Sequence, residues 1–435
     1  MILDDATRWL AQTDALPADV DAKARLLLLD TVGCLLSGLV HPQVQQLGRA
    51  LRLAFPGDTA WPTSDISLAP AGAAALGAAA ACWDEACDGN AAAHGRPGLP
   101  VVPALLALCS TQDVSLRDRS LGALLLALAA GYEIGARAGE VWRIPPGWHV
   151  DGSWHSLGVA AAVAHLTGGP ELIAPAIEAV ACQIPASLYL PISAGSPVRN
   201  IYPAHAVLLG MLAAGSAAAG LAMPRGALDE ARQRVLRATD AASVTPPGHW
   251  TIVEGYLKPY AAVRHTHYGV EAALRLRARH AINADAITAI RLRVYPEAVQ
   301  YCGNRAPRSA IQAQFSLTYA IAAALVLGDL GPAAYADVDD ARITRLEKMV
   351  VVEADTTRTR RGANVSIDFA GQRLSESVDD VAGDPTLPMT REQVVDKFRR
   401  YTEPSIGATR AAALVRFFLD GDHALPARTC FTLES

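Results

Sequence analysis

Charged residues are scarce in this chain of 435 residues: they make up 19% of it, whereas hydrophobic residues make up 51%. A disordered chain has the opposite balance, so the composition predicts a folded protein. The net charge is -5. The chain therefore lacks the basic excess of a nucleic-acid binder, and we expect no nucleic-acid partner.

Cysteine is also sparse, with seven residues at irregular spacing and no Cys-x-x-Cys pair. This excludes the usual zinc-ribbon and redox motifs. The first residues, Met-Ile-Leu-Asp-Asp-Ala-Thr-Arg, lack the basic start and apolar stretch of a signal peptide. We expect a reducing, cytoplasmic location.

One long segment, residues 200–224, contains no charged residue and is long enough to cross a bilayer. It consists mostly of Ala, Gly and Leu, and Tyr202, His205 and Ser216 interrupt it. Such a helix is only weakly hydrophobic, and small residues suit close packing between helices. We therefore expect a soluble protein without a membrane partner.

The length favours two domains, and the hydrophobic pattern changes near residue 255. Before that point the apolar segments are long and Ala-rich, as expected of helices inside a large helical core. They cover residues 20–40, 71–81, 101–109, 121–138, 156–166, 174–182 and 205–221.

Later segments alternate with a period of two, which indicates strands. Strands are predicted at 287–295 and 350–352 and, as a hairpin, at 365–369 and 373–378, with helices at 268–279 and 315–327. Helices at 390–401 and 408–419 follow. The predicted fold is mostly α: an all-helical domain of residues 1–257 with 398–435, and a smaller α+β domain of residues 258–397.

Four segments carry residues suited to chemistry. In the first, residues 83–94, Asp84 and Asp88 would share a helix face if the preceding helix continues. With His94, they suit acid–base work or a cation site, and a capped helix end is the structural alternative. The pattern also resembles the magnesium motif of terpene synthases, but the second metal motif of those enzymes is missing.

The other segments combine histidines and isolated cations. Residues 147–158 place His149 before a helix start, where free N–H groups favour an anion. Arg199 is the sole charge before a long apolar helix, so we expect it to be paired or to bind an anion. Residues 258–267 gather Lys258, Arg264 and His267 at the domain junction. Neighbouring acidic or thiol ligands are lacking, so we expect no metal.

Taken together, these segments resemble the MmgE/PrpD family, whose activities include 2-methylcitrate dehydratase, cis-aconitate decarboxylase and iminodisuccinate epimerase. The resemblance follows the family order along nearly the whole chain. It is carried by Gly-Trp-His at 147–149 with Gly-Ser at 152–153, Arg-Asn-Ile-Tyr-Pro-Ala-His at 199–205, Lys-Pro-Tyr-Ala-Ala-Val-Arg-His-Thr-His at 258–267, the helix at 311–325, and Gly-Asp-Pro at 383–385 with Pro-Met-Thr at 388–390.

The resemblance implies a helical domain, an α+β lid and a homodimer that needs no cofactor. It also implies site residues. Arg199 and Lys258 would clamp substrate carboxylates, supported by Arg264, while His149 would be the acid. Asp84 and His94 would form the base pair. Asp88, Tyr202 and His267 would contact substrate.

Departures from the family pattern lie in residues 84–98. Asp88 stands where Thr is usual, and Gly95-Arg96 intrudes before Pro97-Gly98, so that either His94 or Arg96 occupies the usual His position. Val263 stands where the decarboxylases carry His, which argues against a strict cis-aconitate decarboxylase.

The leading hypothesis is a hydro-lyase that dehydrates a citrate-like or 2-methylcitrate-like hydroxy acid. The alternatives are an epimerase that abstracts the same proton, a cis-aconitate decarboxylase-like enzyme, and a polycarboxylate binder without activity. All share a small anionic substrate, whose charge fixed cations would stabilise.

Overall fold

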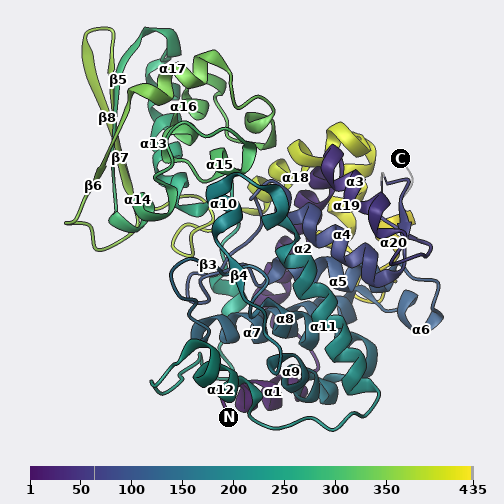
Figure 1. Ribbon diagram of the computed structural model, residues 1–435. Coiled ribbons are helices and arrows are strands. Elements are labelled where there is room, and N and C mark those ends of the chain that lie inside the picture. Colours follow the sequence, from purple (N-terminus) through teal and green to yellow (C-terminus); the bar gives the residue numbers. More distant parts are fainter. Residues whose placement is uncertain (63, 433–435) are drawn as a thin grey trace.

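The computed structural model describes residues 1–62 and 64–432 (Figure 1). Its larger part, which we call the helical unit, contains most of the first 257 residues. Its helices are α1 (Asp4–Ala11), α2 (Ala18–Leu39), α3 (Pro42–Leu51), α4 (Pro70–Trp83), α5 (Gly98–Cys109), α6 (Val114–Arg117), α7 (Leu121–Val141), α8 (His155–Gly168), α9 (Ile173–Ala181), α10 (Leu190–Ala194), α11 (Tyr202–Ala218) and α12 (Ala227–Ala231). Each of the seven predicted helices is confirmed.

The centre of the helical unit is α4, which packs against α2, α5 and α11. Its sequence is mostly Ala, so it forms a helix readily and presents small side chains on every side. Gly38 of α2 shows how closely the helices approach. A Cβ at this position would lie 1.9 Å from the carbonyl oxygen of Ala80, so only glycine fits there.

Two short antiparallel pairs and several tight helical turns complete this unit. The pairs join β1 (Thr59–Ala60) to β2 (Ser67–Leu68) and β3 (Trp148–His149) to β4 (Ser187–Leu188). The sequence pattern did not predict them. The turns are η1 (Pro170–Leu172), η2 (Pro197–Ile201), η3 (Arg232–Leu236, a π-helix) and η4 (Thr251–Glu254).

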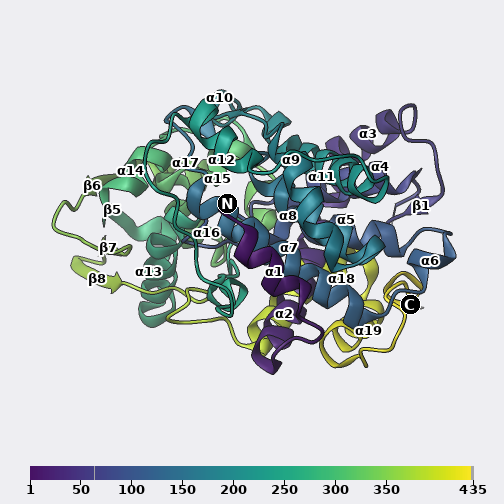
Figure 2. The same ribbon diagram turned by 90° about the horizontal axis from the view of Figure 1, so that it is seen from below.

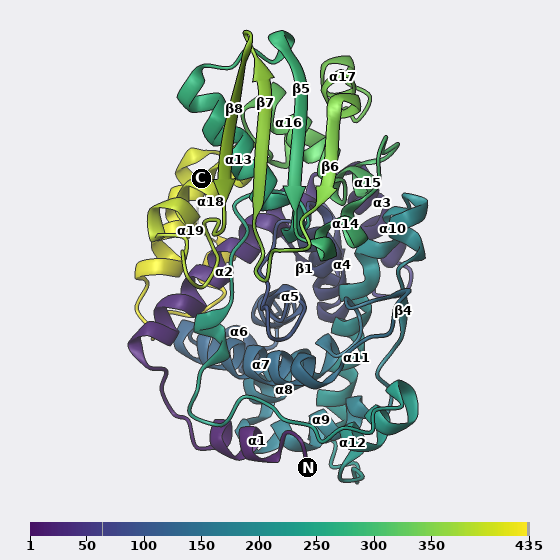
Figure 3. The ribbon, with the colours of Figure 1, turned by 90° about the vertical axis from the view of Figure 1, so that its left-hand side faces the viewer.

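The second part, which we call the sheet unit, is a four-stranded sheet with helices packed against it (Figure 3). The strand order is β6-β5-β7-β8, with β5 and β6 parallel and the other pairs antiparallel. The strands are β5 (Ile287–Val294), β6 (Val350–Ala354), β7 (Ala363–Phe369) and β8 (Gln372–Val378). The accompanying helices are α13 (Arg264–His280), α14 (Pro296–Cys302), α15 (Ala310–Gln314), α16 (Leu317–Leu327) and α17 (Ala341–Met349), with η5 (Ala284–Ala286) and η6 (Pro332–Tyr335).

The predicted alternation in β5 is confirmed, since Ile290, Leu292 and Val294 are buried. The predicted helix at 315–327 corresponds to α16, whereas the segment 311–325, given as one helix, comprises α15 and most of α16. Ser316 separates them, and its side chain accepts the Tyr319 N–H to cap α16. The chain is therefore mostly α-helical, as predicted.

The last helices, α18 (Arg391–Ile406), α19 (Ala408–Asp420) and α20 (Thr429–Thr432), lie beyond the sheet unit in sequence. Both α18 and α19 pack against α2 (Figure 2). Contact with α2 is what a discontinuous helical domain requires. The domain limits at residues 257 and 397 stay a prediction.

Two helices of the described residues are long and apolar enough to cross a membrane: α7, and the continuous helical stretch Pro197–Ala218 that contains α11. The bent pair α2 and α3 would also qualify as one span. Within α7, 83% of the most apolar window is buried inside the protein, against 44% for the stretch with α11. Protein therefore covers α7, whereas half of the α11 surface is uncovered.

A buried ion pair fastens α18 to α2. Lys397 Nζ donates to Asp30 Oδ1 at 2.6 Å and to the carbonyl oxygen of Ala86 at 2.7 Å. The side chains of Lys397 and Asp30 are 2% and 0% exposed. A charge buried this deeply is stable only with its partner.

We expect Lys397→Met to lower the free energy of unfolding by about 3–5 kcal/mol, because it leaves Asp30 buried without its cation. The matched control is Arg391→Met. The Arg391–Asp420 pair joins α18 to α19 with both side chains about half exposed, so its loss should cost less than about 1 kcal/mol. Thermal or urea unfolding of the two variants checks this. Equal losses would show that the buried pair does not hold α18 in place.

Candidate active site

Glu85 is the point where three buried cations meet. Helix α4 ends at Trp83, and Glu85 has a φ of +52°, which is uncommon for a residue other than glycine. Lys258 Nζ donates to Glu85 Oε1 at 2.7 Å and to its backbone carbonyl at 2.9 Å. Arg96 Nη1 donates to Oε2 at 3.1 Å, and Arg199 donates to the same oxygen. The turn after α4 thus places the Glu85 carboxylate among cations from three separate segments of the chain.

Asp151 is the second carboxylate of this cluster. Arg96 donates to both of its oxygens, and Arg199 Nη2 lies 3.2 Å from Oδ2. We call Glu85, Asp151, Arg96, Arg199 and Lys258 the ion cluster. Each of these five side chains is at most 5% exposed. Three cations face two carboxylates, so the cluster carries one positive charge in excess, which favours an anionic ligand.

The buried charges shift one another's pKa values. Burial by itself raises the pKa of Glu85, but Arg199, Arg96 and Lys258 outweigh burial and lower that pKa far below its usual range. Asp151 behaves in the same way, because Arg96 and Arg199 lower its pKa. Burial lowers the pKa of Lys258, and Glu85 opposes this effect. Both carboxylates are therefore ionised at neutral pH.

His149 lies beside the ion cluster because β3 pairs with β4, which sets His149 opposite Ser187. Its Nδ1 accepts the backbone N–H of Asp151 at 3.0 Å, so a neutral ring carries its hydrogen on Nε2. Burial lowers the pKa of His149 to about 4, which keeps the ring neutral at pH 7. His149 is thus a proton donor of fixed orientation.

Tyr189 and Tyr202 flank the His149 ring. Their ring centres lie 5.9 and 6.0 Å from it, and the Tyr202 hydroxyl donates to the carbonyl oxygen of Leu188 at 3.0 Å. Tyr202, predicted to contact substrate, is therefore placed next to the predicted acid. Its hydroxyl already has a partner within the protein.

Asp84 and His94 are not brought together. Asp84 accepts the Ser37 hydroxyl at 2.7 Å and lies 3.1 Å from His41 Nε2. His94 is exposed, whereas Arg96 is buried in the ion cluster. Between the two possibilities left open by the sequence, it is Arg96 that points inward. The structure gives no support to an Asp84–His94 base pair, since no hydrogen bond or ion pair joins these two described residues.

Asp88 does not share a helix face with Asp84, because α4 ends before either residue. That expectation is wrong. Asp88 is 1% exposed, its Oδ2 accepts the N–H of Gly98 at 3.0 Å, and its Oδ1 has no partner among the described residues. Burial raises its pKa to about 7. Asp88 therefore changes protonation near neutral pH, which suits it to accept a proton.

Arg264 and His267 form a separate arrangement on the sheet side. Arg264 pairs with Asp384 and donates to His267 Nδ1 at 3.2 Å, while His267 Nε2 donates to the carbonyl oxygen of Ala262 at 3.0 Å. The Arg264 guanidinium also lies 5.0 Å from the ring centre of Tyr256. His267 thus has both ring nitrogens satisfied within the protein. Its geometry is that of a support for Arg264 rather than of a direct substrate contact.

Glu85 and Asp151 were not predicted as site residues from the sequence, and Arg96 was one of two possibilities for the usual His position. Asp151 stands two residues after His149, and a single acidic residue in a Gly-rich loop was the available signal. His265 and His267 face different partners, since His265 Nδ1 lies 2.6 Å from the Tyr295 hydroxyl. Within residues 1–62 and 64–432, no group of three or more His, Cys, Asp or Glu side chains could hold a metal ion.

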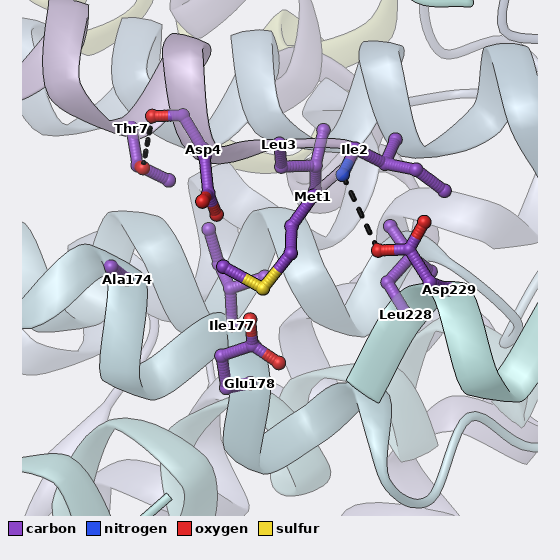
Figure 4. Close-up of a pocket in the computed structure, with 10 residues that line it drawn as sticks. All are labelled: Met1, Ile2, Leu3, Asp4, Thr7, Ala174, Ile177, Glu178, Leu228 and Asp229. Carbon is purple, nitrogen blue, oxygen red and sulfur yellow. Dashed lines mark hydrogen bonds between the residues drawn. The ribbon is translucent and has the colours of Figure 1, made fainter. Parts of the chain in front are cut away.

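The pocket drawn in Figure 4 lies away from the ion cluster, at the N-terminus of the chain. Met1, Asp4, Glu178 and Asp229 contribute to its lining, and the N–H of Ile2 donates to Asp229 Oδ2 at 3.4 Å. Its volume is about 20 Å³, which has room for about one water molecule. This pocket is too small for a polycarboxylate.

Comparison with known proteins identifies the family of this chain. The model of the MmgE/PrpD N-terminal domain matches residues 8–241, and the model of the MmgE/PrpD C-terminal domain matches residues 260–418. The chain belongs to the MmgE/PrpD family. The resemblance inferred from the sequence motifs is thereby confirmed.

Two curated relatives in this family carry the name cis-aconitate decarboxylase. One, from Aspergillus terreus, is 24% identical to this chain, with 92% of this chain and 88% of the relative aligned. The other, from Aspergillus terreus strain NIH 2624 / FGSC A1156, is also 24% identical, over 89% of this chain and 86% of the relative. The family and these relatives support a lyase-like enzyme but do not identify its substrate.

The raised pKa of Asp88 predicts how Asp88→Asn changes stability with pH. The folded protein keeps this proton up to about pH 7, whereas an ordinary aspartate loses it near 3.8. The stability due to the retained proton is complete below pH 3.8 and is lost as pH rises through 7. The wild type should therefore lose about 2–3 kcal/mol relative to Asp88→Asn between pH 5 and pH 8.

Melting temperatures of both proteins at the two pH values test this. The buried histidines are common to both proteins, so their titration cancels in the difference. A difference that stays constant with pH would contradict the assignment of a neutral, protonated Asp88 to the folded state at pH 5.

Proposed function

We propose that this protein is a lyase that dehydrates a small, citrate-like hydroxy acid. The observation that carries the proposal is the ion cluster, in which Arg96, Arg199 and Lys258 exceed the carboxylates by one charge beside a neutral His149. A hydroxy acid with several carboxylates supplies the missing negative charge. It also supplies a hydroxyl group that needs a proton in order to leave.

In the proposed reaction, a base removes a proton from the carbon next to a substrate carboxylate. The negative charge spreads onto that carboxylate, where Arg199 and Lys258 stabilise it. Cations that are already fixed in a dry site need no reorganisation for this step. His149 then gives its Nε2 proton to the departing hydroxyl, which leaves as water. The ring is left as an imidazolate beside Arg96 and Arg199, whose charges act on it, and it regains a proton when the base returns the one that the base removed.

Asp88 is our candidate for the base, in place of the Asp84–His94 pair. It is buried, one of its oxygens is free of partners among the described residues, and burial raises its pKa to about 7. A base works best when its pKa lies near the operating pH. Lys258 and Arg96 both act on its charge, which ties Asp88 to the ion cluster.

Decarboxylation is the second candidate, and the specific observation in its favour is the name shared by the two relatives. Loss of carbon dioxide leaves the same kind of carbanion, which His149 would protonate. Against it stands Val263, at a position where the resemblance to the family's decarboxylases implies His. Epimerisation of a dicarboxylate would use the same proton abstraction without loss of a group.

Product analysis distinguishes these reactions. The purified protein is incubated in deuterium oxide with citrate, 2-methylcitrate or cis-aconitate, and the products are followed by proton NMR and ultraviolet absorbance. We expect a new alkene from a hydroxy acid, without release of carbon dioxide. Carbon dioxide release from cis-aconitate would replace the proposal with decarboxylation, and deuterium incorporation at a stereocentre without elimination would replace it with epimerisation.

Lys258→Met and His149→Gln should each lower kcat/KM by roughly a hundredfold or more, because one removes a charge-stabilising group and the other the acid. The matched controls are Lys348→Met and His280→Gln, both at exposed positions, which should keep near-native turnover. Steady-state kinetics on the substrate found above gives the comparison. Near-native turnover in Lys258→Met and His149→Gln would remove both residues from the mechanism.

We also propose that two copies of this chain associate through α10, η2 and α11. This face exposes large apolar side chains, among them Leu190, Val198, Ile201 and Leu212, which are 64%, 46%, 39% and 63% exposed. The same helical stretch carries the exposed His205 and the partly buried Ser216. These polar groups suit a protein partner better than the hydrocarbon of a bilayer.

Leu212→Asp should convert a dimer into a monomer, because it places a charge in the apolar contact. The matched control, Leu53→Asp, changes a side chain that is 93% exposed outside this face and should leave the mass unchanged. Light scattering coupled to size exclusion, without detergent, measures both. A monomeric wild type, or one that stays in solution only with detergent, would overturn this proposal.

A further inference from the structure

The loop of residues 355–362, between β6 and β7, contains three arginines with different surroundings. Arg358 pairs with Asp379 at 2.7 Å, and Arg360 pairs with Asp380 at 3.3 Å. Arg361 has no carboxylate within ion-pair distance and no hydrogen-bond acceptor among the described residues, although it is only partly exposed. An arginine withdrawn from water is normally paired or binds an anion.

The buried arginines of the protein show how the fold usually pairs this side chain. Six arginines of the described residues are buried, and each is paired with a carboxylate of the protein, as Arg96 and Arg199 are with Glu85. The six are Arg25, Arg96, Arg137, Arg199, Arg232 and Arg264. The fold therefore supplies acids where arginines are structural. Among the described residues it supplies none to the partly exposed Arg361, nor to the partly exposed Arg119 and Arg277, so the place of Arg361 in the fold decides its role.

Strand register places Arg361 at the end of the sheet that faces the helical unit. Ala363, two residues later, begins β7 and pairs with Val294, the last residue of β5, so Arg361 precedes β7 at this end of the sheet. Figure 3 shows this end of β5 and the start of β7 directed toward the helical unit. The loop thus reaches the junction between the two units.

The groups that respond to the Arg361 charge come from both sides of that junction. On the sheet side, burial and, to a smaller extent, Arg361 lower the pKa of His265 to about 3. On the helical side, burial lowers the pKa of His94, and Arg143 and Arg361 add to the effect. Burial raises the pKa of Tyr256 and the Arg361 charge opposes this rise, while the Tyr256 backbone exchanges two hydrogen bonds with Gly89, which follows Asp88. Arg361 therefore lies at the junction of the two units, on the side of the sheet unit.

We propose that Arg361 binds a second carboxylate of the substrate, and so makes the enzyme specific for di- and tricarboxylates. The inference rests on the proposed function, because it concerns the substrate of the same site. The ion cluster holds the carboxylate next to the reacting carbon, and Arg361 holds a carboxylate at the other end of the molecule. The planar guanidinium matches a carboxylate in a two-bond geometry.

Binding of two ligands to Arg361→Ala tests the proposal. The ligands are tricarballylate, which has three carboxylates and no hydroxyl to eliminate, and isobutyrate, which has one. Calorimetry at constant ionic strength should show tricarballylate binding weakened by roughly ten- to a hundredfold, the expected effect of one lost charged hydrogen-bonding partner. The binding of isobutyrate should change less than twofold.

Arg360→Ala is the matched control, since it removes a neighbouring charge from the same loop, and both affinities should stay within twofold. Arg361→Lys should recover part of the lost affinity, because it restores the charge without the planar fork. The melting temperature of each variant confirms that it folds. Arg361 has no partner to leave behind, so we expect little change in stability.

The outcomes separate this inference from the proposed function. If Lys258→Met abolishes tricarballylate binding and Arg361→Ala leaves it unchanged, the ion cluster is the site and the role of Arg361 is wrong. Equal weakening of both ligands in Arg361→Ala also overturns it, since Arg361 would then act only as a distant charge. Failure of the wild type to bind tricarballylate would overturn both the proposed function and this inference.

Discussion

The attachment of Glu85 to three buried cations is the interaction on which the rest of the structure depends. Arg96 follows α4, Arg199 lies in η2, and Lys258 stands at the junction with the sheet unit. A buried charge without a partner costs about 3–5 kcal/mol, so none of the three segments is free to move away alone. The unusual backbone of Glu85 is the local cost of this arrangement, and it is offset by the three ion pairs that it makes possible.

The same network positions the chemistry. Asp151 uses its carboxylate to hold Arg96 and Arg199, and its backbone N–H to fix the tautomer of His149. The acid and the cations are therefore oriented by one residue. This link fixes His149 in the Gly-rich loop, where the short β3–β4 pairing sets the backbone. Cations already in place around a dry site stabilise a carbanion next to a carboxylate in dehydration, decarboxylation and epimerisation alike. The difference between these reactions must therefore come from the residues that handle protons, among which Asp88 departs from the family pattern.

Much of the fold could be predicted from the sequence, because long Ala-rich segments and strict alternation are local signals. The strand β5 and seven helices follow directly from them, namely α2, α4, α5, α7, α8, α9 and α11. The residues of the candidate site were harder to predict from the sequence. Lys258, Arg199 and His149 stood out as isolated cations or as motif residues, and the structure gathers them near Glu85. The choice between His94 and Arg96 could not be made from spacing, since it depends on a loop in which Glu85 and His94 both have positive φ angles. Asp151 pairs with arginines that are 55 and 48 residues away in sequence, a contact that no local pattern encodes. Arg361 looked like its neighbours Arg358 and Arg360, and only their ion pairs distinguish them.

The central claim is that the ion cluster is the place where the substrate carboxylates bind. A crystal structure of the protein with bound citrate tests it most directly. The account predicts a citrate carboxylate within about 3 Å of Lys258 Nζ or of the Arg199 guanidinium, as charged hydrogen bonds require, with His149 Nε2 facing the ligand. Citrate bound elsewhere, with Lys258 and Arg199 contacting only Glu85 and Asp151, would contradict it.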